Sequence, residues 1–221
     1  QWERQFRPAE RVEASWIAAD PNGGTYVVGT KITGSQRYRI GWFVLRYDAA
    51  GNVVWSDENN GSAASALRVV TDAAGNAYVS GGLYVPDASV ATNFTLGIVK
   101  YLPAGRQWVC SIVNPNGTGW PGTPYPSGLA LSPDGTRVAA SGTSLYNWYA
   151  LSCDALTGAK NWQAFEANSV AAADVAITDA GEVYLGSGLP GAGGLLVRKF
   201  GSTGALLWAK TYTPGSYVSR L

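Results

Sequence analysis

The sequence contains no histidine, and this absence excludes several kinds of chemistry. Histidine is the usual general base near neutral pH and the commonest transition-metal ligand, so a Ser-His-Asp triad is excluded. Methionine is also absent, and only two cysteines occur, Cys110 and Cys153. Two cysteines cannot build a four-cysteine zinc site. They can form a disulfide in an exported chain or remain as two buried free thiols, and the sequence leaves both interpretations open.

Charge is scarce as well, because charged residues make up 14% of the 221 residues and the formal net charge is +1. No stretch is strongly basic, which argues against nucleic acid or an anionic membrane surface as the main partner. No apolar run approaches the roughly 18 residues of a transmembrane helix. Hydrophobic residues nevertheless reach 46%. The composition is therefore that of a folded domain with a hydrophobic core.

A phrase that ends in tryptophan recurs along the chain. Trp55, Trp108, Trp162 and Trp208 each follow a turn centred on glycine, and Trp2 stands in the matching place at the start. The successive intervals are 53, 53, 54 and 46 residues. The four phrases read RYDAAGNVVW, KYLPAGRQW, SCDALTGAKNW and KFGSTGALLW. A period of this length indicates a repeat architecture.

Each period also contains a second hairpin phrase, in which two short apolar runs flank a turn rich in Asp, Gly, Asn or Pro. These phrases occupy residues 16–30, 67–81, 129–142 and 175–188. Each repeat thus supplies four strands, which we call A, B, C and D in chain order. Four antiparallel strands in about 50 residues, repeated, are typical of a β-propeller blade. The sequence therefore predicts an all-β fold, a β-propeller or propeller arc of four four-stranded antiparallel blades plus a partial fifth repeat.

The repeat boundaries follow from the same pattern and describe a single domain over residues 1–221. A spare D-type strand and a linker precede the first blade, and the start of a further repeat follows the last. The predicted ranges are 1–13 for the spare strand and linker, 14–62, 63–114, 115–168 and 169–214 for the four blades, and 215–221 for the further repeat.

The spare ends allow three arrangements. The first is a closed four-bladed ring with an extra strand at each end, and the second is an open arc from a larger propeller. In the third, the N-terminal strand of one copy completes a sheet in another copy, since an unpaired strand edge can accept a partner strand. Repeating that contact head to tail would produce a ring or an open fibre.

The recurring phrase predicts a structural clasp, because glycine takes the positive-φ position of the turn and a large flat ring can cover the turn of a neighbouring blade. The predicted clasp residues are Trp55, Trp108, Asp154, Thr157, Gly158, Trp162 and Trp208. The phrase DALTGAKNW resembles the tryptophan-docking motif of the quinoprotein-dehydrogenase-like propellers. Other copies, such as TDAAGNAYVSGG, resemble propeller repeats of bacterial secreted and surface proteins. No catalytic motif of that superfamily is present here, and we expect no cofactor.

The B–C and D–A loops are long and unequal, whereas the A–B and C–D turns are short and uniform. Variable loops on a rigid scaffold are typical of a binding face. Aromatic residues with Gly, Asn and Ser suit a protein surface or a sugar. The alternative is that Trp120 and Tyr125 only pin a proline-rich loop. The candidate contacts to a ligand or partner are Arg37, Tyr38, Arg39, Trp120, Tyr125, Tyr146 and Trp148.

Acidic residues give little support to an enzyme. A glycosidase needs two facing carboxylates, and most acids here sit in turns, where they usually cap their own backbone. We therefore expect no catalytic residues and no metal site. The favoured hypothesis is a non-enzymatic exported scaffold that binds protein, located outside the cell, on its surface or in the periplasm. The alternatives are a self-assembling fibre or ring subunit, a lectin-like module and, least favoured, a quinoprotein-like enzyme. The chain begins at Gln1 and carries no signal peptide, as expected of a processed or excised chain.

Overall fold

The computed structural model describes residues 3, 11–33, 38–60, 64–84, 94–112, 125–144, 147–166, 172–188 and 194–212. All regular secondary structure in these residues is β-strand, and no helix that could span a membrane occurs among them. The strands form four four-stranded sheets, each ordered as in the sequence. The predicted all-β architecture is confirmed.

Each sheet is one blade, with antiparallel pairing between consecutive strands. Blade 1 contains β1 (Arg11–Ala19), β2 (Thr25–Thr33), β3 (Tyr38–Tyr47) and β4 (Val53–Asn60). Blade 2 contains β5 (Ser65–Thr71), β6 (Ala77–Tyr84), β7 (Phe94–Leu102) and β8 (Gly105–Ser111). Blade 3 contains β9 (Tyr125–Leu131), β10 (Arg137–Ser144), β11 (Asn147–Asp154) and β12 (Lys160–Glu166). Blade 4 contains β13 (Ala172–Ile177), β14 (Val183–Gly188), β15 (Leu195–Phe200) and β16 (Leu206–Tyr212).

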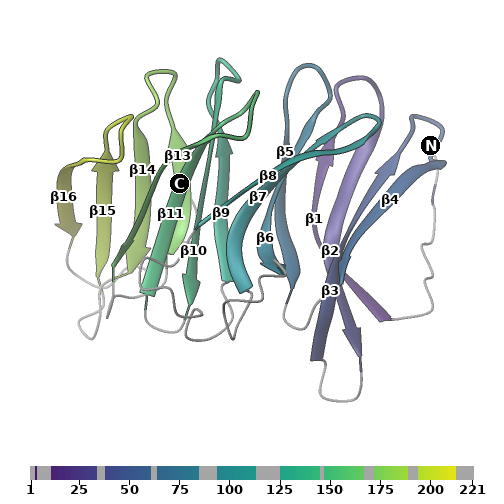
Figure 1. Ribbon diagram of the computed structural model, residues 1–221, viewed down its shortest axis with the longest axis horizontal. Coiled ribbons are helices and arrows are strands. Elements are labelled where there is room, and N and C mark those ends of the chain that lie inside the picture. Colours follow the sequence, from purple (N-terminus) through teal and green to yellow (C-terminus); the bar gives the residue numbers. More distant parts are fainter. Residues whose placement is uncertain are drawn as a thin grey trace.

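The four blades stand side by side in chain order and form an open arc (Figure 1). The first strands of successive blades pack on one another, β1 on β5, β5 on β9 and β9 on β13. Blades 1 and 4 lie at opposite ends of the row. Of the predicted arrangements, the closed four-bladed ring is therefore wrong, because the three pairwise packings do not bring β13 back to β1.

The predicted repeat boundaries differ from the sheets at the start of blade 1. Strand β1 begins at Arg11, inside the segment assigned to a spare strand and linker. The sheets of blades 2, 3 and 4 fall inside their predicted ranges. The predicted D-type strand around Trp2 and the further repeat at 215–221 lie outside the described residues.

Three apolar clusters fill the spaces between successive blades, and a fourth lies on the far face of blade 1. Strand β11 is buried along nearly all of its length because blade 3 lies between blades 2 and 4. Strand β16, the last strand of the last blade, is exposed at every residue. The eight hairpin turns lie at one end of the blades, and each has one glycine with positive φ, as the turn signals predict.

Candidate functional site

The recurring tryptophans join each blade to the next one. The Trp55 indole Nε1 donates a hydrogen bond to the Pro103 carbonyl in blade 2 at 2.8 Å, and its ring stacks on Tyr101 with 5.4 Å between centroids. Trp108 Nε1 donates to the Leu156 carbonyl in blade 3 at 3.2 Å. Each ring therefore covers the C–D turn of the following blade, the role that the clasp hypothesis assigned to it.

Trp162 makes the third contact in a different way. Its ring is buried and stacks on Phe200 of blade 4 with 5.5 Å between centroids. Its Nε1 finds no hydrogen-bond partner among the described residues. The carbonyl at the matching position, that of Ser202, instead accepts a hydrogen bond from Arg137 Nη1 at 3.4 Å. At this turn Arg137 makes the polar contact and Trp162 only packs.

Glycine is required in the C–D turns of blades 3 and 4 for two reasons, the backbone conformation and the lack of space for a side chain. Gly158 has φ +75° and Gly204 has φ +85°, a region that side chains other than glycine rarely adopt. A Cβ at Gly158 would lie 2.6 Å from the Trp108 ring, and a Cβ at Gly204 would lie 2.7 Å from the Trp162 ring. In the phrase DALTGAKNW, Gly158 thus contacts Trp108 of the previous blade, and Trp162 packs on the next blade.

The acidic residue of the phrase holds the turn in shape. Asp154 Oδ1 accepts hydrogen bonds from the Thr157 backbone N–H at 2.7 Å and the Thr157 hydroxyl at 2.8 Å. The backbone hydrogen bond from Thr157 is the main cause that holds the pKa of Asp154 below its ordinary value. Asp48 and Asp134 accept local hydrogen bonds in their own turns in the same way, and their pKa values are also lowered. These carboxylates act as turn caps.

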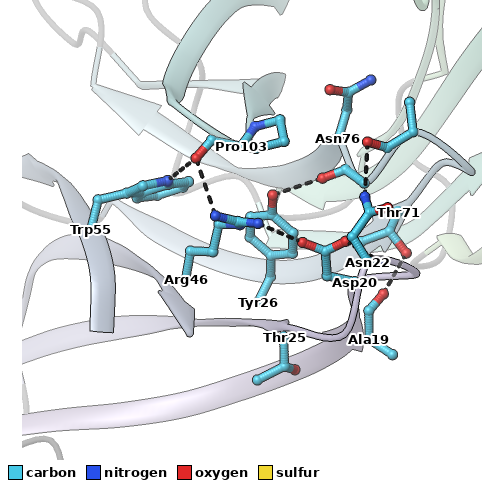
Figure 2. A network of polar contacts seen from close by, with 12 residues as sticks. Ala19, Asp20, Asn22, Thr25, Tyr26, Arg46, Trp55, Thr71, Asn76 and Pro103 are labelled. Carbon is cyan, nitrogen blue, oxygen red and sulfur yellow. Dashed lines mark hydrogen bonds and ion pairs between the residues drawn. The ribbon is translucent and has the colours of Figure 1, made fainter. Parts of the chain in front are cut away.

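A polar network crosses from blade 1 to blade 2 (Figure 2). Tyr26 donates its hydroxyl hydrogen to the Gly75 carbonyl at 2.8 Å. Arg46 donates to Asp20 Oδ2 at 2.9 Å and to the Pro103 carbonyl at 3.4 Å. Burial of Asp20 would raise its pKa, but hydrogen bonds from the Asn22 N–H and from Arg46 outweigh burial and lower it. The charged pair therefore has a structural role at this interface.

Blades 2 and 3 are joined by a similar set of contacts and by a covalent bond. Lys100 Nζ donates to the Ala155 carbonyl at 2.8 Å. The Tyr78 hydroxyl shares its hydrogen between Asp72 Oδ2 of its own blade, at 3.1 Å, and the Ala155 carbonyl, at 3.3 Å. Burial lowers the pKa of Lys100 and raises that of Tyr78. Cys110 on β8 and Cys153 on β11 form a disulfide, with 6.6 Å between their Cα atoms. The structure thus selects the disulfide over two free thiols.

The interface of blades 3 and 4 corrects one predicted binding residue. Trp148 was expected on the loop face, but it is only 3% exposed. Its Nε1 donates to Glu166 Oε2 at 2.9 Å, and the Arg198 guanidinium lies 4.7 Å from its ring centroid. Arg198 also pairs with Glu166 and donates to Ser187 Oγ at 3.1 Å. Trp148 is enclosed by blade 4 and is not presented to a ligand.

The other loop-face candidates fall mostly outside the described residues. Arg37, Trp120 and Tyr146 lie outside the described residues. For Tyr38 and Arg39, at the start of β3, only the backbone is described. Tyr125 begins β9 and is 49% exposed. Among the described residues, the structure therefore brings no cluster of predicted loop-face residues together, and no group of three or more His, Cys, Asp or Glu could hold a metal ion.

No prediction from the sequence covered three basic residues of the third strands. Arg46, Lys100 and Lys199 occupy the same place in the third strand of their blades and lie opposite the recurring tryptophans. A signal was present, since each of them comes directly before an aromatic residue in the phrases RYD, KYL and KF. The repeat pattern could have placed a cation opposite Trp55, Trp108 and Trp208, but not opposite Trp162, which faces Ser152. It did not indicate which group each cation would reach.

No protein-family model and no curated protein matches the chain. Among solved structures, the chain is similar to the Dos1 propeller, with 10% identity and a TM-score of 0.54 over 92% of this chain and 59% of that one. It is also similar to a putative 6-phosphogluconolactonase from Bacteroides uniformis, with 14% identity and a TM-score of 0.51 over 90% of this chain and 56% of that one. The chain thus spans less than two thirds of the length of these proteins.

This likeness shows the fold alone, and together with the four sheets it defines the described part of the chain as a β-propeller arc of four blades. The narrower resemblance to quinoprotein-dehydrogenase-like propellers and a bacterial origin stay predictions. The similarity extends to a protein whose name describes a lactonase, so the likeness by itself supports neither an enzyme nor a scaffold.

Proposed function

We propose that the chain is a non-enzymatic, exported β-propeller scaffold that binds protein partners. The observation that carries this proposal is that the ionisable side chains described below make structural contacts within and between the blades. Arg46, Arg106, Lys100 and Arg198 bridge blades, and the turn aspartates cap their own backbone. These groups are engaged in holding the blades together, as expected of a rigid frame that presents variable loops.

The disulfide supports export, because disulfides persist in oxidising compartments outside the cytosol. Cell fractionation of the native source tests this part of the proposal. A chain recovered only from the reducing cytosol, with Cys110 and Cys153 as thiols, would contradict it.

Binding through the loop end can be tested with matched variants. Proteins from the extracellular fraction of the source would be captured on the immobilised chain and identified by mass spectrometry. A partner that binds the face of the B–C and D–A loops should no longer bind the double variant Trp120→Ala and Tyr125→Ala. It should still bind Leu156→Ala, which removes an exposed side chain from a C–D turn at the opposite end of the blades. Binding that is unchanged in both variants argues against the proposal. Turnover of a lactone, a glycoside or a quinone-linked alcohol by the pure chain also argues against it.

Self-assembly is a second candidate, favoured by the exposed last strand. Every residue of β16 is exposed, including Leu206, Leu207 and Trp208, although the other three tryptophans of the repeat cover a neighbouring blade. Contact through the end strands predicts that deletion of residues 1–7 abolishes assembly, measured by sedimentation. Oligomers that persist after the deletion would show that the N-terminal strand is not the contact.

A carbohydrate-binding role is the remaining alternative. Of its predicted loop-face residues, Trp148 is buried between blades and Tyr125 is exposed. A glycan array with the intact chain and with Tyr125→Ala tests this role, and an array without hits would eliminate it.

A further inference from the structure

Blade 4 carries the same three side chains that blade 2 uses to hold blade 3. Tyr184, Lys199 and Trp208 occupy the positions of Tyr78, Lys100 and Trp108. The two tyrosine–tryptophan pairs both have 6.0 Å between ring centroids. Both lysine Nζ atoms lie 5.3 Å from the centroid of the tyrosine ring. The arrangement is therefore already formed on the outer face of blade 4.

In blade 2 each member of this set bonds to the next blade, whereas in blade 4 the set has no next blade among the described residues. Lys100 donates to the Ala155 carbonyl, and Trp108 donates to the Leu156 carbonyl. The Tyr78 hydroxyl, which lies nearest to Asp72 Oδ2 of its own blade, also reaches the Ala155 oxygen. Lys199 instead pairs with Glu182 of its own blade at 2.8 Å, and Trp208 stays 36% exposed. Blade 4 thus presents one half of the repeated interface.

Blade 1 presents the other half. In blade 2, Val69 on β5 and Val79 on β6 face each other in register and are buried under blade 1, at 1% and 0% exposed. The matching residues of blade 1 are Ile17 and Val27, which also face each other in register. Ile17 is 63% exposed.

The exposed part of the blade 1 face is hollowed. A groove of about 680 Å³ is lined by Ala14, Ser15, Trp16, Ile17 and Val27. Leu45 and Tyr47, further out on the same face, are buried within the chain. The accessible part of the blade 1 face is therefore its inner half, over β1 and β2.

We propose that blade 4 of one copy docks on blade 1 of a second copy of this chain, head to tail, over the groove at Ile17. This inference rests on the self-assembly candidate above and names its surface. A second copy fits this groove because the same contact already occurs three times within the chain. In each case the face of one blade that is turned toward the C-terminal end of the row packs on the facing side of the next blade. Among the described residues, each copy presents one such face of each kind, on blade 4 and on blade 1. A heterologous contact of this type closes into a ring or extends into a fibre.

The experiment uses the full chain and two single variants. Trp208→Ala removes the exposed ring from blade 4, and Ile17→Asp places a charge in the groove of blade 1. Sedimentation velocity over a concentration series should show that the wild type assembles. Each variant alone should weaken assembly about tenfold or more, as loss of a central apolar anchor does at interfaces. Leu156→Asp, at a site 73% exposed on a hairpin turn, is the control and should assemble like the wild type.

A mixture of the two variants decides the geometry. Trp208→Ala retains an intact blade 1 and Ile17→Asp retains an intact blade 4, so the equimolar mixture should form one-to-one dimers and nothing larger. A wild type that stays monomeric overturns both this inference and the self-assembly candidate. Assembly that is insensitive to both variants, or sensitive to Trp208→Ala but not to Ile17→Asp, overturns the head-to-tail contact and leaves self-assembly through another surface. Near-ultraviolet circular dichroism verifies that each variant is folded.

Discussion

The indole Nε1 of Trp55 donates a hydrogen bond to the carbonyl oxygen of Pro103, 48 residues further along the chain, at 2.8 Å. The bond joins the last strand of blade 1 to the outer turn of blade 2, and Trp108 repeats it toward blade 3. Because the fold is a row of similar sheets, such contacts between neighbours determine how firmly the blades are held together. They are therefore the first features to test.

Trp55→Phe retains an aromatic ring and removes the donor. We expect the free energy of unfolding to fall by about 1 kcal/mol, the usual net value of one hydrogen bond, with some further loss from the smaller ring. Urea unfolding followed by circular dichroism measures the change. Trp208→Phe is the control, since Trp208 lies on the exposed strand β16 and covers no other blade among the described residues. An equal loss in both variants would contradict the role of the bond.

Gly158→Ala should destabilise the chain more than Gly135→Ala. Both glycines have positive φ, +75° and +71°, so both substitutions carry a backbone cost of about 1 kcal/mol or more. Only at Gly158 would the new Cβ meet the Trp108 ring, at 2.6 Å, whereas nothing lies within 4 Å at Gly135. We expect the loss at Gly158 to be larger by about 1–3 kcal/mol, the typical cost of overpacking. Equal losses in the two variants would mean that the ring moves aside freely.

Reduction of the disulfide should loosen the arc at its centre. Cys110 and Cys153 are 43 residues apart, and the loop-closure entropy for this separation corresponds to about 4 kcal/mol. Urea unfolding with and without dithiothreitol measures the difference. The double variant Cys110→Ser and Cys153→Ser should match the reduced chain and should no longer respond to the reductant. An unchanged unfolding midpoint on reduction would show that the bond contributes nothing to stability.

Asp20 should make the chain sensitive to acid. Its pKa is lower in the folded state, so its contribution to stability is present above the unfolded-state pKa near 4 and is lost as the pH falls through the folded-state value. Its side chain is fully buried against Arg46. Asp20→Asn should therefore cost about 3 kcal/mol at pH 7, as breaking a buried ion pair does, and should flatten the decline in stability below pH 4.

The matched variant for this test is Asp48→Asn. Asp48 caps an exposed turn and bonds to Asn52 without a cationic partner among the described residues. Unfolding curves over a pH series should separate the two variants at neutral pH. Similar behaviour of both variants would show that the Asp20–Arg46 pair contributes no more than a turn cap.

Local features of the sequence predicted most of the strand order. The turn chemistry of Asp48 to Asn52 or Asp154 to Gly158 depends on hydrogen bonds within a few residues, so the hairpins can be read from short phrases. The period between Trp55, Trp108 and Trp162 then fixes four strands for each blade. These features are local, and composition and spacing express them directly.

The partners across the blades could not be predicted in the same way. Trp148 was assigned to a binding face because it adjoins a loop, yet β11 is covered on both sides by blades 2 and 4 and has no exposed face. Glu166 accepts a hydrogen bond from Trp148 and pairs with Arg198 on the next blade, a contact that no local pattern indicates. Each of these contacts depends on the distance between sheets, which strand periodicity does not contain.

The sequence by itself predicted the four-strand repeat, its hairpin turns and its recurring tryptophan, because these depend on local turns and on a repeat spacing. Only the tertiary structure decided that Cys110 and Cys153 are bonded, that the arc stays open between β13 and β1, and that Trp208 has no blade to cover among the described residues. The disulfide and the open arc follow from how successive sheets pack against one another. That packing is a property of the interfaces between blades, and the strand pattern of a single repeat does not contain it.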